Sequence, residues 1–278
     1  MAIYVPNTEI VGISSGQVPA DMREHANSVC AIVNQAQIDR NGKPKTALFG
    51  LGFTAGAYGD KYFGEQLCGP YLKTIPTVWG EGSGTGFAVG KMLIATAYHV
   101  VEDHAPKTLR AVFGLDLDAR GSNRRQCQVF DIDRVHAFDR QRDWALLVLR
   151  KPLGKERPAL PLASAVELER LALNAPLAMI GHPFGQPMQY ATGQFIGQRD
   201  TSDLAAKIAG FTGNSGSPVF ALGRLGKVIG IYKSHDHEED FEEKREPPHH
   251  RCWDYKRVQM GVAQRDLLAA ISPLVEYI

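Results

Sequence analysis

Three residues in separate segments of this chain could together make a serine hydroxyl nucleophilic. Ser215 stands in GFTGNSGSPVF, residues 210–220, His99 follows an apolar run in MLIATAYHVVED, and Asp143 precedes one in QRDWALLVL. Glycine, asparagine, serine and proline are also the usual residues of turns, so Ser215 alone would indicate only a tight turn. An imidazole can take the proton of a serine hydroxyl, and a carboxylate can hold that imidazole in place. The three residues therefore need to be brought together by the fold.

The carboxylate of this set has competing candidates. A carboxylate beside an apolar strand is costly to bury unless it is paired, which favours Asp143 as the partner of His99. Asp131 and Asp133, in VFDIDRV, are the alternatives. A strand-initiating Asp143 that faces water is the simplest structural interpretation of the same residue. We predict a His99–Asp143 pair, with Ser215 Oγ close enough to His99 Nε2 for a hydrogen bond, allowing for the looser geometry of an enzyme without substrate.

The elements that must position these residues are predicted to be strands. Short apolar runs separated by turn residues are typical of a barrel or sandwich. They are SVCAIV, GTGFAV, KMLIATAYHV, LRAVFG, QCQVFDIDRVHAF and WALLVL, and, beyond a Pro-rich and charged segment, APLAMIGHP, QYATGQFIG, SPVFAL, KVIGIYKS and RVQMGVA. The spacing of Leu267, Ile271, Leu274 and Val275 predicts one face of a short C-terminal helix, which Pro273 breaks or kinks.

These runs divide the chain into two lobes. Residues 1–25 are predicted to be an N-terminal extension. Residues 26–150 are predicted to form a first lobe, which carries His99 and Asp143 and has an irregular insertion at about 55–80. Residues 151–161 are predicted to be a linker. Residues 162–278 form the second lobe, with Ser215, a charged loop at 235–257 and the C-terminal helix.

The order His99, Asp143, Ser215, with TAYHVV, DWALLVL and GNSGSPVF, resembles that of the trypsin-like (chymotrypsin-fold) serine peptidases. The bacterial branch, with glutamyl endopeptidases and high-temperature-requirement proteases, is the most similar, and the resemblance covers residues from about 82 to 265. It implies an all-β fold of two antiparallel six-stranded β-barrels with the active site in the cleft between them. It also implies a serine endopeptidase in which Ser215 attacks, His99 acts as base and then acid, and Asp143 fixes the histidine tautomer. The N–H groups of Gly213 and Ser215 would form the oxyanion hole.

The same resemblance implies where the first specificity pocket lies. Its base would come from Ala209 and Gly210, and one wall from Tyr232, Lys233 and Ser234. Ala209 stands where trypsin needs an aspartate, which argues against cleavage after Arg or Lys. Glutamyl endopeptidases have a histidine where Tyr232 falls, so glutamate specificity is not implied either. The expectation is a neutral small or aliphatic residue on the acyl side of the cleaved bond.

Other hydrolase classes fit the sequence poorly. An α/β-hydrolase needs Gly-x-Ser-x-Gly followed by a helix, whereas Ser217 and Pro218 follow here. The stretch SHDHEEDFEEKREPPHHRC contains the ligand types His235, His237, His249, His250 and Cys252. Their spacing matches neither a His-Glu-x-x-His helix nor a paired-cysteine site, which favours a solvated charged loop. We therefore expect no metal and no other cofactor. The alternative to an enzyme is a catalytically silent trypsin-fold module that binds peptides or acts as a chaperone.

Composition gives no sign of a nucleic acid or membrane partner. The 278 residues carry a formal net charge of +1 and no apolar run of membrane-spanning length. The expected partner is a protein or peptide substrate. Residues 30–80 and the loop at 235–257 are the segments through which a regulatory partner could gate the site.

Location and redox state follow from the N-terminal residues and the cysteines. The start has no basic segment followed by an apolar one, so we expect a cytoplasmic protein, or a secreted one if the start is a processed end. The four cysteines, Cys30, Cys68, Cys127 and Cys252, form no Cys-x-x-Cys pair and are expected to be free thiols. The stretch Ile10-Val11-Gly12 resembles the new N-terminus of an activated trypsinogen, but Asn214 carries no charge to receive it, so we interpret the match as a coincidence.

Overall fold

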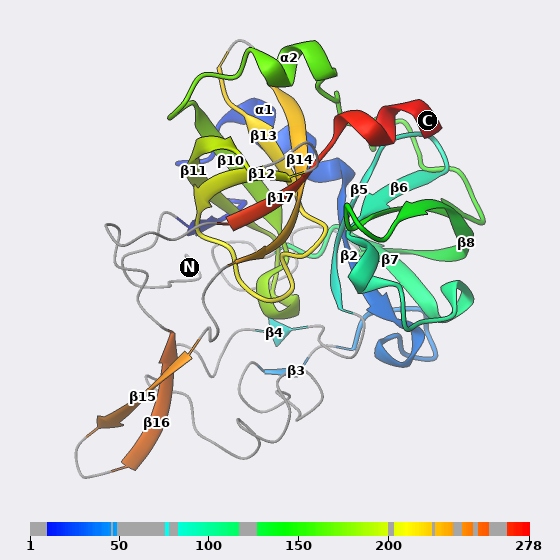
Figure 1. Cartoon of the computed structure of the whole chain (residues 1–278). Helices are drawn as coiled ribbons and strands as arrows, with labels where there is room; N and C mark the ends of the chain where they lie inside the picture. Colours follow the sequence, from blue (N-terminus) through cyan, green and yellow to red (C-terminus); the bar gives the residue numbers. More distant parts are fainter. Residues whose placement is uncertain are drawn as a thin grey trace.

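The structure is a computed structural model, and it describes residues 10–45, 47–48, 76–77, 83–116, 127–199, 203–223, 226–235, 241–246, 250–255 and 266–278. In these residues the chain is mostly β-strand and forms two barrels with short helices around them (Figure 1). No helix in these ranges is long and apolar enough to cross a membrane. The predicted fold class, two antiparallel six-stranded β-barrels, is confirmed.

The first barrel closes through six strands in the order β2-β5-β6-β9-β8-β7. They are β2 (Val29–Asn34), β5 (Gly84–Ala88), β6 (Leu93–Thr96), β7 (Leu109–Phe113), β8 (Gln128–Asp139) and β9 (Trp144–Leu149). All six side chains of β9 are buried, because WALLVL presents apolar groups to both of its faces. Short 3-10 helices, η2 (Gln35–Gln37), η5 (Tyr98–Val100) and η6 (Pro106–Thr108), lie between the strands.

The second barrel closes through β11-β10-β13-β14-β17-β12, with β12 pairing back to β11. Its strands are β10 (Pro176–Gly181), β11 (Gln189–Gln198), β12 (Asp203–Ile208), β13 (Pro218–Ala221), β14 (Lys227–His235) and β17 (Asp266–Ala270). Buried and half-buried residues alternate along β12, as expected for a strand with one face on the core. The 3-10 helix η7 (Pro183–Gly185) connects β10 to β11.

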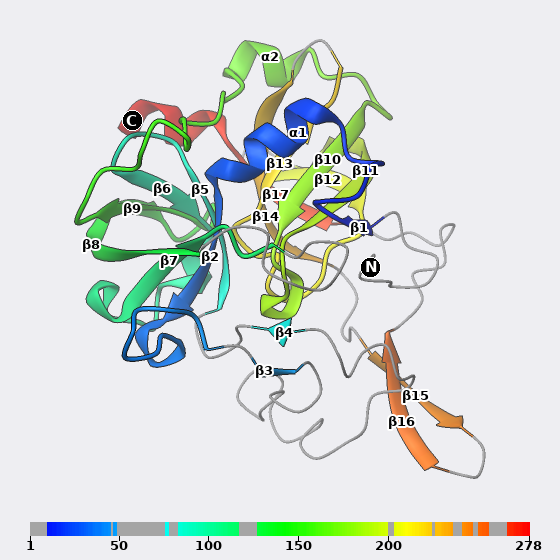
Figure 2. The same cartoon turned by 180° about the vertical axis from the view of Figure 1, so that it is seen from behind.

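The N-terminal segment packs on the second barrel before the chain enters the first. Strand β1 (Ile10–Gly12) pairs antiparallel with β11, and helix α1 (Ala20–His25) follows it (Figure 2). Met22 is fully buried, and the His25 ring stacks on Phe220 of β13 with centroids 5.2 Å apart. A 3-10 helix, η1 (Ala26–Ser28), leads into β2. Residues 10–25 of the predicted extension thus pack on the second barrel, and Ile10–Gly12 has a structural role as a strand.

The predicted linker is hydrogen-bonded to both barrels. Leu160 N–H donates to Ala88 O at 2.9 Å, and Pro161 O accepts from Val228 N–H at 2.8 Å. Helix α2 (Ala165–Glu169) then begins with a capping box, in which Ser164 and Glu167 each accept from the other's backbone N–H. The last two residues of the linker are therefore bonded to one strand of each barrel, β5 and β14.

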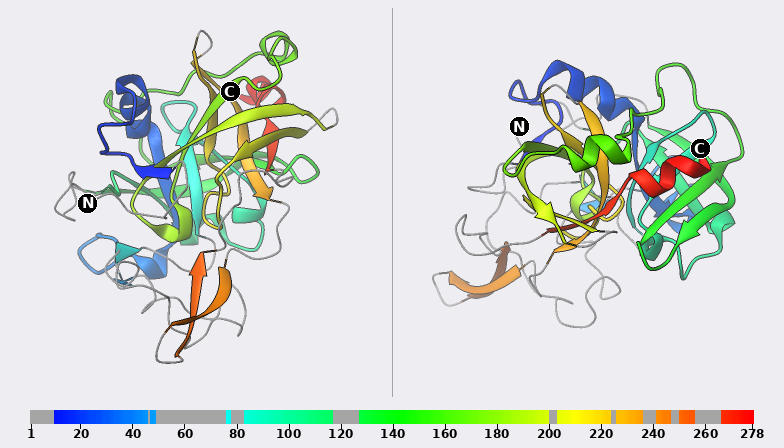
Figure 3. Two further views of the ribbon diagram at one scale, coloured as in Figure 1. Left: turned by 90° about the vertical axis from the view of Figure 1, so that its left-hand side faces the viewer. Right: turned by 45° about the horizontal axis from the view of Figure 1, so that its top comes forward.

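The C-terminal helix is shorter than its apolar spacing suggested. It is a 3-10 helix, η8 (Ser272–Tyr277), and Leu267 lies before it in β17, which pairs with β12 and β14 (Figure 3). A short apolar run is compatible with a strand as well as with a helix. Here residues 266–270 form a strand because they pair with the edges of β12 and β14. The Tyr277 ring lies 5.4 Å from the Trp144 ring, so η8 returns to the first barrel.

Two predicted loops are only partly described. Of the insertion at about 55–80, only β4 (Pro76–Thr77) is described, and it pairs with β3 (Ala47–Leu48). The charged loop prediction at 235–257 is wrong for much of its length, since β15 (Phe241–Glu246) and β16 (His250–Tyr255) form an antiparallel hairpin. Strands pair through their backbones and do not require apolar side chains. The charged composition of this stretch therefore gave no sign of the hairpin. The predicted strand RVQMGVA lies outside the described residues.

The cysteines with described side chains are not bonded to each other. Cys30 is fully buried in β2, where burial raises the pKa of its thiol, and Cys127 is half-buried. Cys68 and the side chain of Cys252 lie outside the described part, so the expectation of four free thiols stays a prediction for them.

Candidate active site

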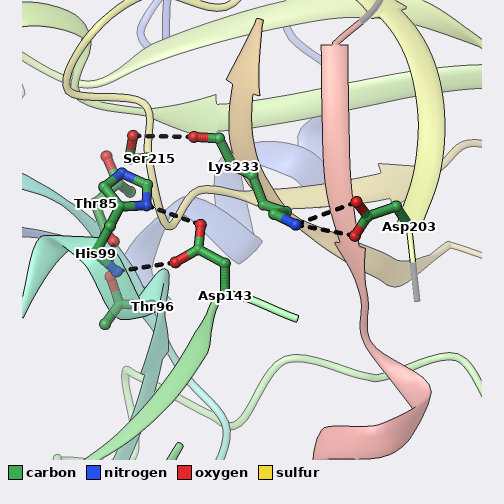
Figure 4. Close-up of polar contacts among 7 residues, drawn as sticks. All are labelled: Thr85, Thr96, His99, Asp143, Asp203, Ser215 and Lys233. Atoms are coloured by element: carbon green, nitrogen blue, oxygen red, sulfur yellow. Dashed lines mark hydrogen bonds and ion pairs between the residues drawn. The ribbon is translucent and has the colours of Figure 1, made fainter. Parts of the chain in front are cut away.

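His99 and Asp143 come together because they lie at the ends of paired strands. His99 lies in η5 directly after β6, Asp143 directly precedes β9, and Thr96 pairs with Ala145 across the two strands. Asp143 Oδ2 lies 2.8 Å from His99 Nδ1, and Asp143 Oδ1 accepts the His99 backbone N–H at 2.9 Å (Figure 4). Asp143 has a positive φ of 58°, a conformation that aspartate tolerates better than most residues. The predicted pair is therefore present in the geometry.

The alternative carboxylates have other partners. Asp131 pairs with Arg110 Nε at 2.8 Å, and Asp133 pairs with Arg134 at 3.0 Å and Arg150 at 3.8 Å. Neither contacts His99. The structure therefore favours Asp143 over both for orienting the imidazole.

Ser215 lies in a tight turn between β12 and β13 that only glycines could build. Gly213 and Gly216 have φ values of 92° and 91°, a region that side chains with a Cβ rarely adopt. A Cβ on Gly216 would also overlap Thr85 O and Thr96 Oγ1 of the first barrel. The turn therefore packs closely against β5 and β6, the strands that precede His99 in the first barrel.

The backbone N–H groups of this turn fall into two sets. Those of Asn214, Gly216 and Ser217 donate to carbonyl oxygens at 2.8–2.9 Å. Those of Gly213 and Ser215 donate to no other described residue, although Gly213 is buried and Ser215 half-buried. Buried N–H groups are rarely left without an acceptor, and two in one turn make a concavity suited to an anion. The predicted oxyanion-hole donors are the two that are unpaired.

The Ser215 hydroxyl makes a hydrogen bond to a different acceptor from the predicted one. It donates to Lys233 O of β14 at 3.3 Å, and no hydrogen bond joins it to the His99 ring (Figure 4). A serine hydroxyl needs only a rotation about Cα–Cβ to exchange acceptors, and such contacts are often loose in the absence of a substrate. The structure shows the hydroxyl on the competing carbonyl.

Tyr232 covers the expected base of the specificity pocket. A Cβ on Gly210 would overlap the Tyr232 ring, which is 1% exposed. The phenol donates to Oδ1 of fully buried Asp266 at 3.0 Å, and Asp266 Oδ2 accepts the Ile208 N–H at 3.1 Å. Ala209, beside Gly210, is half-buried and packs on the main core. The ring is thus fixed at its far end and lies over Gly210.

The Lys233 side chain is largely buried and does not face solvent. Its ammonium contacts both oxygens of Asp203, at 3.0 and 3.2 Å, and both side chains are only 13% exposed (Figure 4). Ser234, the next wall residue, is exposed. The positive charge beside the expected pocket is therefore already paired with a carboxylate.

Three residues of this region were missed from the sequence: Thr85, Asp203 and Asp266. Thr85 lies in GTGFAV, where a threonine looks like any strand residue. Asp203 and Asp266 each begin a strand, β12 and β17, and nothing in the local pattern indicates what they contact. Only the paired strands reveal their partners.

No metal site is evident in the described part of the chain, where no three histidine, cysteine or acidic side chains are grouped. The ligand types of residues 235–252 have side chains outside that part, so the expectation of a solvated charged segment stays a prediction.

Comparison with known proteins gives the family. The model of the trypsin-like peptidase domain matches residues 84–231, slightly over half of the chain. The anti-sigma-I factor RsgI9 of Acetivibrio thermocellus is 29% identical over 153 residues, which are 53% of this chain but only 18% of that protein. The solved VesB protease of Vibrio cholerae superimposes with a TM-score of 0.53 at 13% identity, over 90% of this chain and 62% of that one. The chain thus spans less than two thirds of each, and the VesB likeness concerns the fold alone. By the family match, which contains His99, Asp143 and Ser215, the chain belongs to the trypsin-like peptidase domain family.

Proposed function

We propose that the chain is a serine endopeptidase that hydrolyses peptide bonds through Ser215, His99 and Asp143. The observation that carries the proposal concerns the N–H groups of Gly213 and Ser215, for which the described residues supply no acceptor. They lie next to the Ser215 hydroxyl, in the same site as a carboxylate-bound histidine. Such donors stabilise a developing oxyanion by roughly 3 kcal/mol each when they are preorganised. A turn that only held the chain would have no reason to leave both unbonded.

The roles follow from the hydrogen bonds. The Ser215 hydroxyl turns from Lys233 O to His99 Nε2, which takes its proton as Oγ bonds to the substrate carbonyl carbon. The carbonyl oxygen becomes an oxyanion between the Gly213 and Ser215 N–H groups. His99 then gives the proton to the leaving amine, and the C–N bond breaks to leave an acyl-enzyme.

Deacylation repeats these steps with water. His99 takes a proton from the water, whose oxygen attacks the acyl carbon, and the bond to Ser215 Oγ breaks as His99 returns the proton to it. Asp143 stays ionised throughout and holds the imidazole by its Nδ1 side. The products are a free carboxylic acid, a free amine and the unchanged serine.

For the cleaved bond, we propose a small neutral residue on the acyl side. The Tyr232 ring occupies the space above Gly210, where a large side chain would enter. The Lys233 ammonium is paired with Asp203 and so gives little attraction to an acidic side chain. Both observations favour a small neutral or aliphatic residue over the glutamate of the bacterial relatives.

The test is labelling with a fluorophosphonate probe together with cleavage of a peptide library. The wild-type protein is expected to be labelled on Ser215 and to cleave peptides, and Ser215→Ala to do neither. Ser217→Ala, which removes a neighbouring buried hydroxyl of the same loop, is the matched control for the labelled position. A wild-type protein that is folded but neither labelled nor active would favour the silent binding module instead.

A further inference from the structure

Thr85 of the first barrel holds the Ser215 turn of the second barrel through two hydrogen bonds. Its N–H donates to Ser215 O at 2.8 Å, and its Oγ1 donates to Gly213 O at 2.8 Å. Thr85 is fully buried in β5, and its own carbonyl accepts from Thr96 Oγ1 at 2.7 Å. One residue therefore fixes the carbonyl groups of the two residues whose N–H groups are unpaired.

The direction of the Thr85 hydroxyl proton is set by a third contact. His182 N–H donates to Thr85 Oγ1 at 3.0 Å, and a backbone N–H can only donate. The Thr85 proton must therefore point to Gly213 O. The hydroxyl serves as one donor and one acceptor, which neither valine nor alanine can reproduce.

This contact restricts how the turn can rearrange. A peptide group rotates as a rigid plane, so holding Gly213 O fixes the plane that joins Gly213 to Asn214. Holding Ser215 O fixes the plane that joins Ser215 to Gly216. The N–H of Ser215 lies between these two planes, and the N–H of Gly213 adjoins the first. Glycine at 213, with its φ of 92°, would otherwise let its neighbouring peptide turn over at little cost.

We infer that Thr85 is a positioning residue for the oxyanion hole, whose hydroxyl keeps the Gly213 N–H directed at the reacting carbonyl. The inference rests on the proposed peptidase function and adds to it a residue from the opposite barrel. It also means that the nucleophile turn is competent only when the first barrel is docked against it.

The experiment compares Thr85→Val, Thr85→Ser and Ser28→Ala with the wild type. Valine keeps the shape of threonine without its hydroxyl, and serine keeps the hydroxyl. Ser28 is the matched control, because its buried hydroxyl also donates to a backbone carbonyl, Pro158 O at 2.6 Å, far along the chain. For each protein, kcat and KM on a peptide substrate, the inhibition constant of a peptide boronate and Tm are measured.

The expected result is a loss of kcat on the order of 10²-fold for Thr85→Val, as for the removal of one oxyanion donor. KM should change little, and the boronate, whose oxygen occupies the oxyanion hole, should bind more weakly by a similar factor. Thr85→Ser and Ser28→Ala should stay close to wild type in kcat. If Thr85→Val does not fold, Thr85→Cys takes its place, because a thiol is a weak donor.

Unchanged kcat and boronate affinity in the folded Thr85→Val or Thr85→Cys protein would overturn the inference, as would a Thr85→Ser variant as impaired as Thr85→Val. A purely structural role would lower Tm without separating kcat from KM. Should the wild type show no activity, the proposed function fails, and crystal structures decide the inference alone. A reoriented Gly213 peptide in Thr85→Val would then support it, and an unchanged residue 212–216 backbone would contradict it.

Discussion

Asp143 contacts His99 with both of its carboxylate oxygens, one on the ring at Nδ1 and one on the backbone N–H. An ionised carboxylate can only accept hydrogen bonds, so Nδ1 must carry the proton. Nε2 is then left with its lone pair, which is the form that can take a proton from a serine hydroxyl. The backbone contact holds the carboxylate in place, and the Nδ1 contact orients the ring.

Asp143→Asn should therefore impair turnover while the fold is retained. The amide oxygen can still accept the His99 N–H, and asparagine tolerates the positive φ, but the NH₂ would face Nδ1 and favour the wrong tautomer. We expect kcat to fall by about 10⁴-fold, measured by peptide hydrolysis, with little change in Tm. Asp131→Asn is the control and should retain activity, since Asp131 pairs with Arg110. An active Asp143→Asn protein would show that another group orients His99.

Tyr232 should set the size of the residue accepted before the cleaved bond. The wild type should cleave after alanine or valine faster than after phenylalanine, lysine or glutamate in a peptide library. Tyr232→Val removes the ring above Gly210 and should shift the preference towards larger apolar residues. Tyr232→Phe, which keeps the ring and removes the hydroxyl that donates to Asp266, should retain the wild-type order. The same preference in all three proteins would place the pocket elsewhere.

Gly216→Ala and Gly223→Ala separate backbone strain from contact between the barrels. Both glycines have positive φ, 91° and 84°, so alanine at either costs roughly 1–2 kcal/mol. At Gly223 a Cβ would meet nothing within 4 Å, whereas at Gly216 it would overlap Thr85 and Thr96. We expect Gly223→Ala to lose only the strain energy in urea unfolding and to stay active. Gly216→Ala should be far less stable or inactive, and equal losses in the two would argue against a tight contact at Gly216.

His182 should make folding less favourable as the pH falls. Burial lowers the pKa of its imidazole from 6.5 to about 4, so between these values the unfolded chain binds a proton that the folded chain does not. The free energy of unfolding should therefore decrease from pH 7 to pH 4, by on the order of 3 kcal/mol in total from this group.

The control for this pH effect is His182→Asn. The amide of the introduced asparagine can donate to Gln186 O, as the His182 ring does at 2.9 Å, but it does not titrate. Urea unfolding at pH 7, 6, 5 and 4.5 should show a shallower decrease for the variant, since all other titrating groups contribute equally to both proteins. Parallel curves would mean that His182 is not buried in its neutral form.

The residues that carry the expected chemistry were accessible from the sequence because each sits in a distinctive local pattern. Gly213 and Gly216 around Ser215 indicate a tight turn, Asp143 before a wholly apolar strand needs a partner, and the order of the three segments in the chain singles out the catalytic interpretation. Thr85 has no such pattern, since its role depends on a turn far along the chain. The interpretation of Leu267 as helical failed for the same reason, because the strand edges it pairs with come from distant segments.

Strand β17 closes the second barrel, yet it follows Ser215 in the chain by two complete strands, β13 and β14, and a hairpin. The 3-10 helix η8 beyond it returns to Trp144 of the first barrel. A chain that emerges from its N-terminus thus contains all three reactive residues before the barrel that supports Ser215 can form. Strand β1 likewise can pair only after β11 has been synthesised, because β11 is its partner in the sheet. Pairing over such separations is slow. Under the proposed function, the chain would become able to cleave peptides only after β17 has been made and paired. The order of the strands would thereby protect a newly made chain, and its neighbours, from premature cleavage.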